Sequence, residues 1–88
     1  MHYVIHCLNK SKKETFISIT TNDVDIVNPA VSIGQTPLIK HWDLRHDKIA
    51  WEPVATFERE KGAIQLVDDL VNFYSNAGFK IVMDSDIK

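Results

Sequence analysis

The strongest pattern in this sequence lies in residues 58–83, EREKGAIQLVDDLVNFYSNAGFKIVM. Apolar residues recur there every three or four positions, the spacing that gives an α-helix one apolar stripe: Ala63, Leu66, Val67, Leu70, Phe73, Tyr74 and Ala77. Gly78 follows the last of these residues, where a glycine commonly ends a helix because it tolerates a positive φ. The pattern therefore predicts a helix over residues 58–77 and a closing strand over residues 79–83.

Residues 54–57 read as a strand that leads into this helix, so the C-terminal part of the chain has the order strand, helix, strand. If both strands belong to one sheet, the crossover between them is right-handed and the strands run parallel. We therefore expect the apolar stripe of the helix to cover one face of a mixed sheet.

The N-terminal segment predicts a β-hairpin. Residues 2–8 and 14–21 are rich in β-branched and aromatic residues, and the polar turn 9–13 joins them. Alternation places Tyr3, Ile5 and Cys7 on one face of the first strand, and Val, Ile and Thr together make up 23 of the 88 residues. Because β-branched side chains favour pleated surfaces, a protein dominated by its sheet is expected.

The middle of the chain has weaker patterns. Residues 24–27 and 31–33 are short β-like pieces separated by turn residues, which predicts an irregular excursion with at most one short edge strand. Residues 40–44 and 49–53 predict a second hairpin around a connection at 45–48. Because a proline cannot donate to a strand ladder, the last residue of that hairpin, Pro53, should lie at an edge or a bend.

The whole chain, residues 1–88, is predicted to form a single α+β domain. Its mixed or antiparallel sheet would have four to five strands and one long C-terminal helix on one face, in the order β-β-(irregular)-β-β-α-β. With 44% apolar and 25% charged residues, the composition is that of an ordinary globular domain and not of a disordered chain. A net charge of −2 also excludes a strongly basic nucleic-acid module.

Cysteine usage and the N-terminus bear on the compartment. Cys7 is the single cysteine of the sequence, so no internal disulfide can form, whereas secreted domains of this size usually need such cross-links. The N-terminus lacks the basic and apolar regions of a signal peptide, and no apolar segment is long enough to cross a bilayer. We therefore expect a cytoplasmic protein without membrane contact.

The predicted second hairpin would pair two tryptophans. If Leu44 lies opposite Ile49, then Trp42 faces Trp51 across the two strands. Tryptophan is enriched among residues that carry binding energy at protein interfaces. A face of this hairpin that the helix leaves uncovered would therefore be a candidate contact surface for a protein partner.

The opposite face of the same hairpin would present His41, Asp43 and Glu52. These side-chain types suit a divalent cation or acid–base catalysis. The alternative interpretation is a solvated sheet face with a His–Glu contact between the strands, because a register slip of one residue would scatter the trio.

Two further groups of residues are read as structural. His2 and His6 lie about 13 Å apart on an extended strand, so they cannot share one metal ion, and we expect both to be half-exposed. Lys10, Lys12 and Lys13 form a small basic turn, but the acidic residues elsewhere disfavour nucleic-acid binding, and a solvated turn is expected.

The sequence favours a small, non-enzymatic, protein-binding regulator of the inhibitor, immunity or phage-encoded modulator type, with no cofactor and no metal. Its contact residues would be Trp42, Trp51, His41, Asp43 and Glu52. This hypothesis depends on the short chain and on the lack of a glycine-rich phosphate-binding loop or a nucleophile motif. The alternative is a small-ligand or metal-dependent enzyme or binding protein that uses the polar trio, at a homodimer interface if the sheet leaves a face or an edge uncovered.

Overall fold

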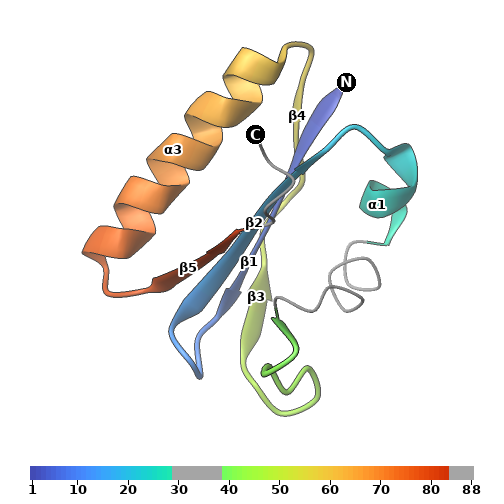
Figure 1. Cartoon of the computed structure of the whole chain (residues 1–88). Helices are drawn as coiled ribbons and strands as arrows, with labels where there is room; N and C mark the ends of the chain where they lie inside the picture. Colours follow the sequence, from blue (N-terminus) through green and yellow to red (C-terminus); the bar gives the residue numbers. More distant parts are fainter. Residues whose placement is uncertain (29–38, 84–88) are drawn as a thin grey trace.

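Five strands and two helices form the part of the chain that the structure describes, residues 1–28 and 39–83 of the computed structural model (Figure 1). The elements are β1 (His2–Asn9), β2 (Glu14–Thr20), α1 (Asp23–Val27), β3 (Ile49–Trp51), β4 (Ala55–Phe57), α3 (Glu60–Asn76) and β5 (Lys80–Met83). The strands form one mixed sheet, and α3 packs on one of its faces. The predicted α+β class, with its single long C-terminal helix, is confirmed.

Strand β1 lies at the centre of the sheet. It pairs antiparallel with β2 on one side and antiparallel with both β3 and β4 on the other side. Strand β5 pairs parallel with β2, which gives the order β3-β1-β2-β5, with β4 beside β1. Strands β4 and β5 therefore run in the same direction on either side of α3, as the strand–helix–strand pattern predicts.

A β-bulge separates β3 from β4. Cys7 of β1 lies opposite Trp51 and Val4 lies opposite Ala55, so two residues of β1 face three residues of the other strand. Pro53 is the middle residue of those three. Pro53, which has no N–H to donate to a strand ladder, therefore lies at an edge of the sheet where the strand is interrupted, as predicted.

Helix α3 buries its apolar stripe against one face of the sheet. Ala63 and Val67 of the helix pack with Val4 of β1 and Ile17 of β2, all nearly or fully buried. The helix ends at Asn76, two residues before Gly78, whose φ of 87° is the left-handed conformation that a glycine after a helix commonly adopts. The predicted helix is therefore confirmed, with bounds one to two residues shorter than residues 58–77.

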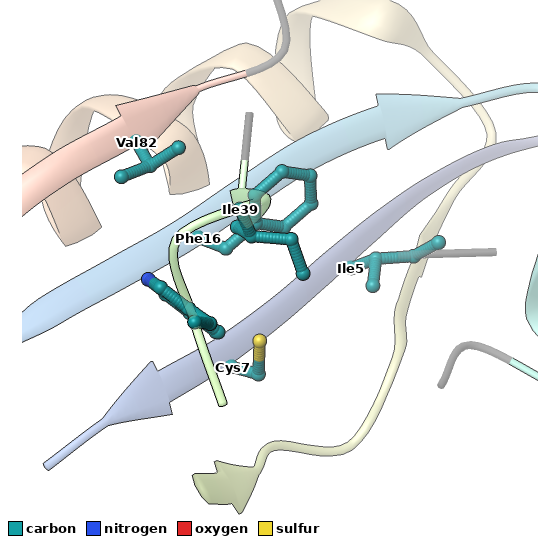
Figure 2. Close-up of a cluster of buried hydrophobic side chains, with 6 residues drawn as sticks. Ile5, Cys7, Phe16, Ile39 and Val82 are labelled. Atoms are coloured by element: carbon teal, nitrogen blue, oxygen red, sulfur yellow. The ribbon is translucent and has the colours of Figure 1, made fainter. Parts of the chain in front are cut away.

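The opposite face of the sheet is buried as well, under an irregular segment that begins at Ile39 (Figure 2). The side chains of Ile39 and Trp42 pack there with residues from β1, β2 and β5: Ile5, Cys7, Phe16 and Val82. Strand β1 consequently has apolar neighbours on both faces, which explains its nearly continuous burial. The assignment of Ile5 and Cys7 to one face of β1 is confirmed, because both pack in the cluster on this second face.

Two predictions for the middle of the chain are wrong. Residues 24–27 belong to the short helix α1, not to a strand, and Ile26 of this helix packs against the cluster on the second face. Residues 40–44 form no strand, so the second hairpin does not exist, and β3 pairs with β1 instead. The β-like piece at residues 31–33 lies outside the described residues.

Candidate functional site

The structure separates the two tryptophans that the sequence placed opposite each other. Trp42 is 6% exposed and belongs to the core, with its indole Nε1 donating to Glu14 Oε1 at 3.4 Å. Trp51 lies on the edge strand β3 and is 44% exposed. The predicted cross-strand pair is therefore wrong, and Trp51 alone remains a surface residue.

The polar trio is also dispersed. His41 and Asp43 lie in the segment that covers the second face of the sheet. His41 Nε2 lies 2.6 Å from Oε1 of Glu14 in β2, and Asp43 Oδ2 lies 2.8 Å from Nδ1 of His46. Glu52 lies at the bulge, where its backbone N–H donates to the carbonyl oxygen of His6. Within the described ranges, no group of three or more His, Cys, Asp or Glu side chains could hold a metal ion.

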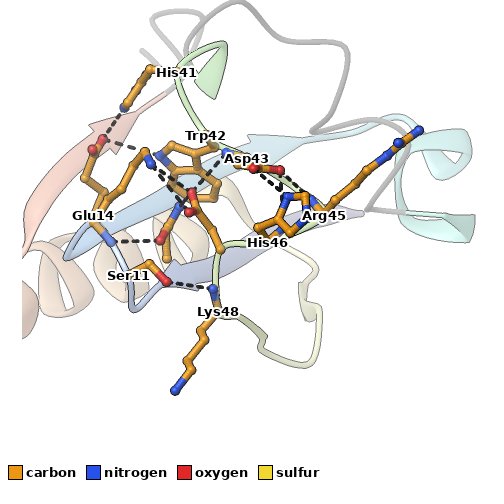
Figure 3. Close-up of polar contacts among 11 residues, drawn as sticks. Ser11, Glu14, His41, Trp42, Asp43, Arg45, His46 and Lys48 are labelled. Carbon is orange, nitrogen blue, oxygen red and sulfur yellow. Dashed lines mark hydrogen bonds and ion pairs between the residues drawn. The ribbon is translucent and has the colours of Figure 1, made fainter.

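Two aspartates instead fix the course of the segment that covers the second face (Figure 3). Asp43 Oδ1 accepts from the backbone N–H groups of Arg45 and His46, at 3.0 and 3.2 Å. Asp47 Oδ2 accepts from the side-chain amide of Asn9 at 2.8 Å and from the backbone N–H of Asp43 at 3.0 Å. Hydrogen bonds to the ionised carboxylates lower the pKa of both groups, and the largest cause is the bond with the His46 side chain for Asp43 and the bond from the Asn9 side chain for Asp47.

The basic turn between β1 and β2 takes part in the same contacts. Lys12 Nζ forms an ion pair with Asp47 Oδ2 at 3.2 Å, Ser11 Oγ accepts from the backbone N–H of Lys48, and the backbone N–H of Lys10 donates to the carbonyl oxygen of Lys48. The turn therefore packs against the segment that follows Asp43. The prediction of a solvated turn did not include these contacts.

The site with the most complete geometry is a cleft of about 200 Å³ between α3 and the bulge that joins β3 to β4. We call it the His6 cleft, and its lining residues are Val4, His6, Glu52, Pro53, Ala55, Leu66, Leu70 and Tyr74. Its walls are mostly apolar, with a few polar groups among them, as is typical of small-ligand sites. The His6 and Tyr74 rings face each other with centroids 5.1 Å apart.

The tautomer of His6 follows from its hydrogen bonds. The hydroxyl of Thr15 donates to the carbonyl oxygen of Cys7 at 3.1 Å, because a carbonyl can only accept. The same hydroxyl oxygen lies 2.8 Å from His6 Nε2 and has no second proton, so it must accept from an Nε2–H. Neutral His6 therefore carries its proton on Nε2 and keeps an acceptor lone pair on Nδ1.

Nδ1 of His6 is the ring nitrogen that the contact with Thr15 leaves unused. Across the described ranges, no buried side-chain nitrogen or oxygen lacks a hydrogen-bond partner, and the bond of His6 to Thr15 is made by Nε2. Nδ1 is therefore not buried. His6 itself lines the cleft, so its remaining acceptor is available to a molecule bound there.

Burial and the charge of Glu52 act in opposite directions on the pKa of His6 and in the same direction on the pKa of Tyr74. Desolvation lowers the pKa of His6 below 6.5, and the nearby negative charge of Glu52 offsets part of this effect. Burial, followed by the charge of Glu52, raises the pKa of Tyr74 above 10.0. At neutral pH the cleft therefore presents an uncharged imidazole and an uncharged phenol.

The lowered pKa of His6 predicts a loss of stability in weak acid. The unfolded chain binds a proton near pH 6.5 and the folded chain binds it at a lower pH, so the free energy of unfolding falls as the pH drops below 6.5. The expected loss is about 1.4 kcal/mol for each unit by which folding lowers the pKa. Urea unfolding at pH 7.5, 6.5 and 5.5 measures it. A His6→Gln variant with the same slope as the wild type would contradict the assignment, because the other three histidines are common to both proteins.

The sequence contained a usable signal for this cleft. His6 alternates with Val4 and Leu8 on the face that α3 covers, and Tyr74 belongs to the apolar stripe of the helix that was predicted to pack there. A histidine on a covered face is buried, so the expectation that His6 is half-exposed is wrong. Glu52 could not be found in this way, because its position depends on the pairing of β3 with β1 and on the bulge.

A second, larger hollow of about 600 Å³ lies where β4 turns into α3. Its lining includes Glu58, Arg59 and Lys61, which are exposed and of both charge signs. None of the described residues that line this hollow is a buried polar residue, so we do not treat the hollow as a candidate functional site.

Comparison of the chain with protein-family models, with curated proteins and with solved structures finds no match. In the described part of the chain, no helix is long and apolar enough to cross a membrane.

Proposed function

We propose that this chain is a small, non-enzymatic, protein-binding regulator of the inhibitor, immunity or modulator type. The observation that carries the proposal is Trp51, a large apolar side chain that is 44% exposed on an edge strand of the sheet. Tryptophan side chains supply a large share of the binding energy at protein interfaces. The contact surface proposed here is the outer edge of β3 and β4, the side of these strands that faces away from β1.

The backbone of β3 supports this assignment. The carbonyl oxygen of Lys48 accepts from the N–H of Lys10, the residue after β1, and the N–H of Glu52 donates to His6 of β1. Along an antiparallel strand, residues that point toward the neighbouring strand alternate with residues that point away from it. The backbone groups of Ile49 and Trp51 therefore point away from β1, where none of the described strands pairs with them. Such an edge can bind an extended segment of a partner as an added strand, with side-chain contacts giving specificity.

The other edge of the sheet is less suited to this role. The outer side of β5 also has no strand partner in the described part of the chain, but no large apolar side chain of β5 is exposed. An exposed apolar anchor beside unpaired backbone groups is therefore found at β3 and not at β5. For this reason we propose the outer edge of β3 and β4 as the contact surface.

We further propose that the protein acts in the cytoplasm. Cys7, the single cysteine of the chain, is fully buried, and burial raises the pKa of its thiol to about 12. The domain thus relies on apolar packing without a disulfide cross-link, which is usual for domains of reducing compartments.

The proposal predicts that Trp51→Ala loses a partner that the wild type retains. Tagged wild type, Trp51→Ala and Phe73→Ala are used to capture proteins from lysate of the native host. Phe73 is an exposed aromatic residue of α3, so its variant removes a similar surface away from β3. The expected loss of affinity for Trp51→Ala is about 30-fold or more, because interface tryptophans cost about 2 kcal/mol or more when truncated.

Amide hydrogen exchange of the purified complex supplies the second readout. Strand addition should protect the backbone N–H groups of Ile49 and Trp51, which already point away from β1. Equal capture by Trp51→Ala and wild type, or protection confined to α3, would refute the proposed surface. Urea unfolding of both variants shows that any lost capture is not caused by unfolding.

A further inference from the structure

The polar groups that face the His6 cleft are nearly all hydrogen-bond acceptors. The carboxylate of Glu52 makes no ion pair or hydrogen bond with any described residue, and Nδ1 of His6 holds an unused lone pair. Tyr74 adds an aromatic ring and a phenolic oxygen. Among the described residues, no lysine or arginine lines the cleft. A group that matches this set must carry several N–H donors and a positive charge.

The walls of the cleft define the rest of the ligand. Val4, Ala55, Leu66 and Leu70 present aliphatic side chains beside the polar groups. A cavity of about 150 Å³ with apolar walls accommodates a benzene molecule, so the cleft of about 200 Å³ has room for a chain of four to five methylene groups. An aliphatic chain that ends in a cationic head fits both parts of the cleft.

We propose that the His6 cleft binds a primary alkylammonium group. Its N–H donors would reach the Glu52 carboxylate and Nδ1 of His6, and its methylene chain would lie along Leu66 and Leu70. The ring of Tyr74 adds a cation–π contact. An anion is disfavoured, because it would meet the Glu52 carboxylate with no cation among the described lining residues to offset it.

This inference concerns the cleft, whereas the proposed function concerns the outer edge of β3 and β4, and neither depends on the other. An alkylammonium group has two sources: a free small amine and the side chain of a lysine in a protein segment. Both sources present the same chemistry to Glu52 and His6, so the experiment contains one arm for each.

The test is a titration of isotope-labelled protein, followed by NMR, with n-butylammonium and with n-butanol at pH 7.5. Binding should move the ¹⁵N resonance of His6 Nδ1 and the ring signals of Tyr74 in a saturable way, at millimolar concentrations typical of so small a ligand. Butanol, which has the same chain and lacks the charge, should bind at least about 10-fold more weakly, since a hydrogen bond to a charged group contributes about 1.5–3 kcal/mol.

Two matched variants separate the cleft from a general charge effect. Glu52→Gln should weaken butylammonium binding at least about 10-fold. Glu58→Gln, which makes the same change in charge at an exposed residue outside the cleft, should leave it unchanged. Both positions are exposed, so neither change should unfold the protein.

The results of this titration test the proposed binding in the His6 cleft and do not test the proposed contact surface of β3 and β4. Equal binding of butanol and butylammonium, unchanged binding by Glu52→Gln, or shifts that spare His6 and Tyr74 would overturn the inference. A lysine-containing peptide that binds more tightly than butylammonium identifies a protein lysine as the source, and equal affinities identify a free amine. Loss of partner capture by Trp51→Ala bears on the outer edge and leaves these results unchanged.

Discussion

Replacement of Trp42 by alanine is expected to lower the free energy of unfolding by about 3–5 kcal/mol. The side chain is 6% exposed and closes the second face of the sheet against residues of three strands. The change leaves a large cavity there and also removes the donor to Glu14. Domains of this size are stable by about 4–13 kcal/mol, so Trp42→Ala should unfold at a much lower urea concentration than the wild type.

Trp51→Ala is the matched control, since it makes the same substitution on an exposed strand. It should change the free energy of unfolding by less than about 1 kcal/mol. If Trp42→Ala were as stable as Trp51→Ala, the segment beginning at Ile39 would not cover the sheet. Because Trp42 is a core residue, its variant cannot report on partner binding, and the test of the interface depends on Trp51.

The second large effect is expected for Ile17→Ala, with a loss of about 2–5 kcal/mol. Ile17 is fully buried and, among the residues that the structure describes, is the largest side chain with that degree of burial. It packs between β2 and α3, beside Ala63 and Val67. A cavity at this position removes contacts from the sheet and from the helix together, so the loss should lie well above that of a surface substitution.

Ile64→Ala on α3 provides the control for this substitution. Ile64 is exposed, and alanine has the higher helix propensity, so the variant should remain within about 1 kcal/mol of the wild type. Thermal unfolding of both variants in one buffer gives the comparison. Similar losses in the two proteins would mean that α3 does not dock on β2 through the face that carries Ala63 and Val67.

The elements that local pattern could predict are those with strong periodicity. The hairpin of β1 and β2, the helix α3 and the strand β5 each show the alternation or the helical spacing of their final structure. Ile5 and Cys7 lie together on one face of β1, and Ala63 and Val67 of the helix stripe pack against the other face of the sheet, as predicted. Here local preference and tertiary packing agree, so the sequence alone was sufficient.

The segment from Lys40 to Pro53 shows where local pattern fails. Trp42 and Leu44 alternate with polar residues as in a strand, but the carboxylates of Asp43 and Asp47 bond backbone N–H groups and turn the chain. The strand that follows pairs with β1, about 40 residues earlier in the chain. Such a pairing is set by tertiary contacts, which no local pattern reveals.

The short helix α1 gives a second example. Its residues Asp23–Val27 are mostly β-branched or acidic, which is typical of a strand or a turn. In the folded chain the hydroxyl of Tyr3 donates to the carboxylate of Asp23, and Ile26 packs against the second face of the sheet. Tertiary contacts therefore outweigh a weak local preference at this position.

The candidate site was predictable to the same extent as the fold. The helix face that carries Tyr74 and the strand face that carries His6 were both known from periodicity, and their contact follows from packing the helix on the sheet. The tautomer of His6 depends on its contact with Thr15 of the neighbouring strand β2. This contact follows from the register in which β1 and β2 pair as a hairpin. Glu52 depends on a bulge between two strands that pair over long range.

The bulge at Pro53 also limits how copies of this protein can associate. A strand that adds to the outer edge of β3 and β4 meets Ile49–Trp51 in one register and Ala55–Phe57 in a register shifted by one. Between them it meets three residues, of which the middle one, Pro53, has no N–H. A long flat strand cannot stay paired across this step, whereas a short segment that ends at Pro53 can. Open-ended stacking of sheets into fibrils is thereby hindered at an edge that still admits a short peptide.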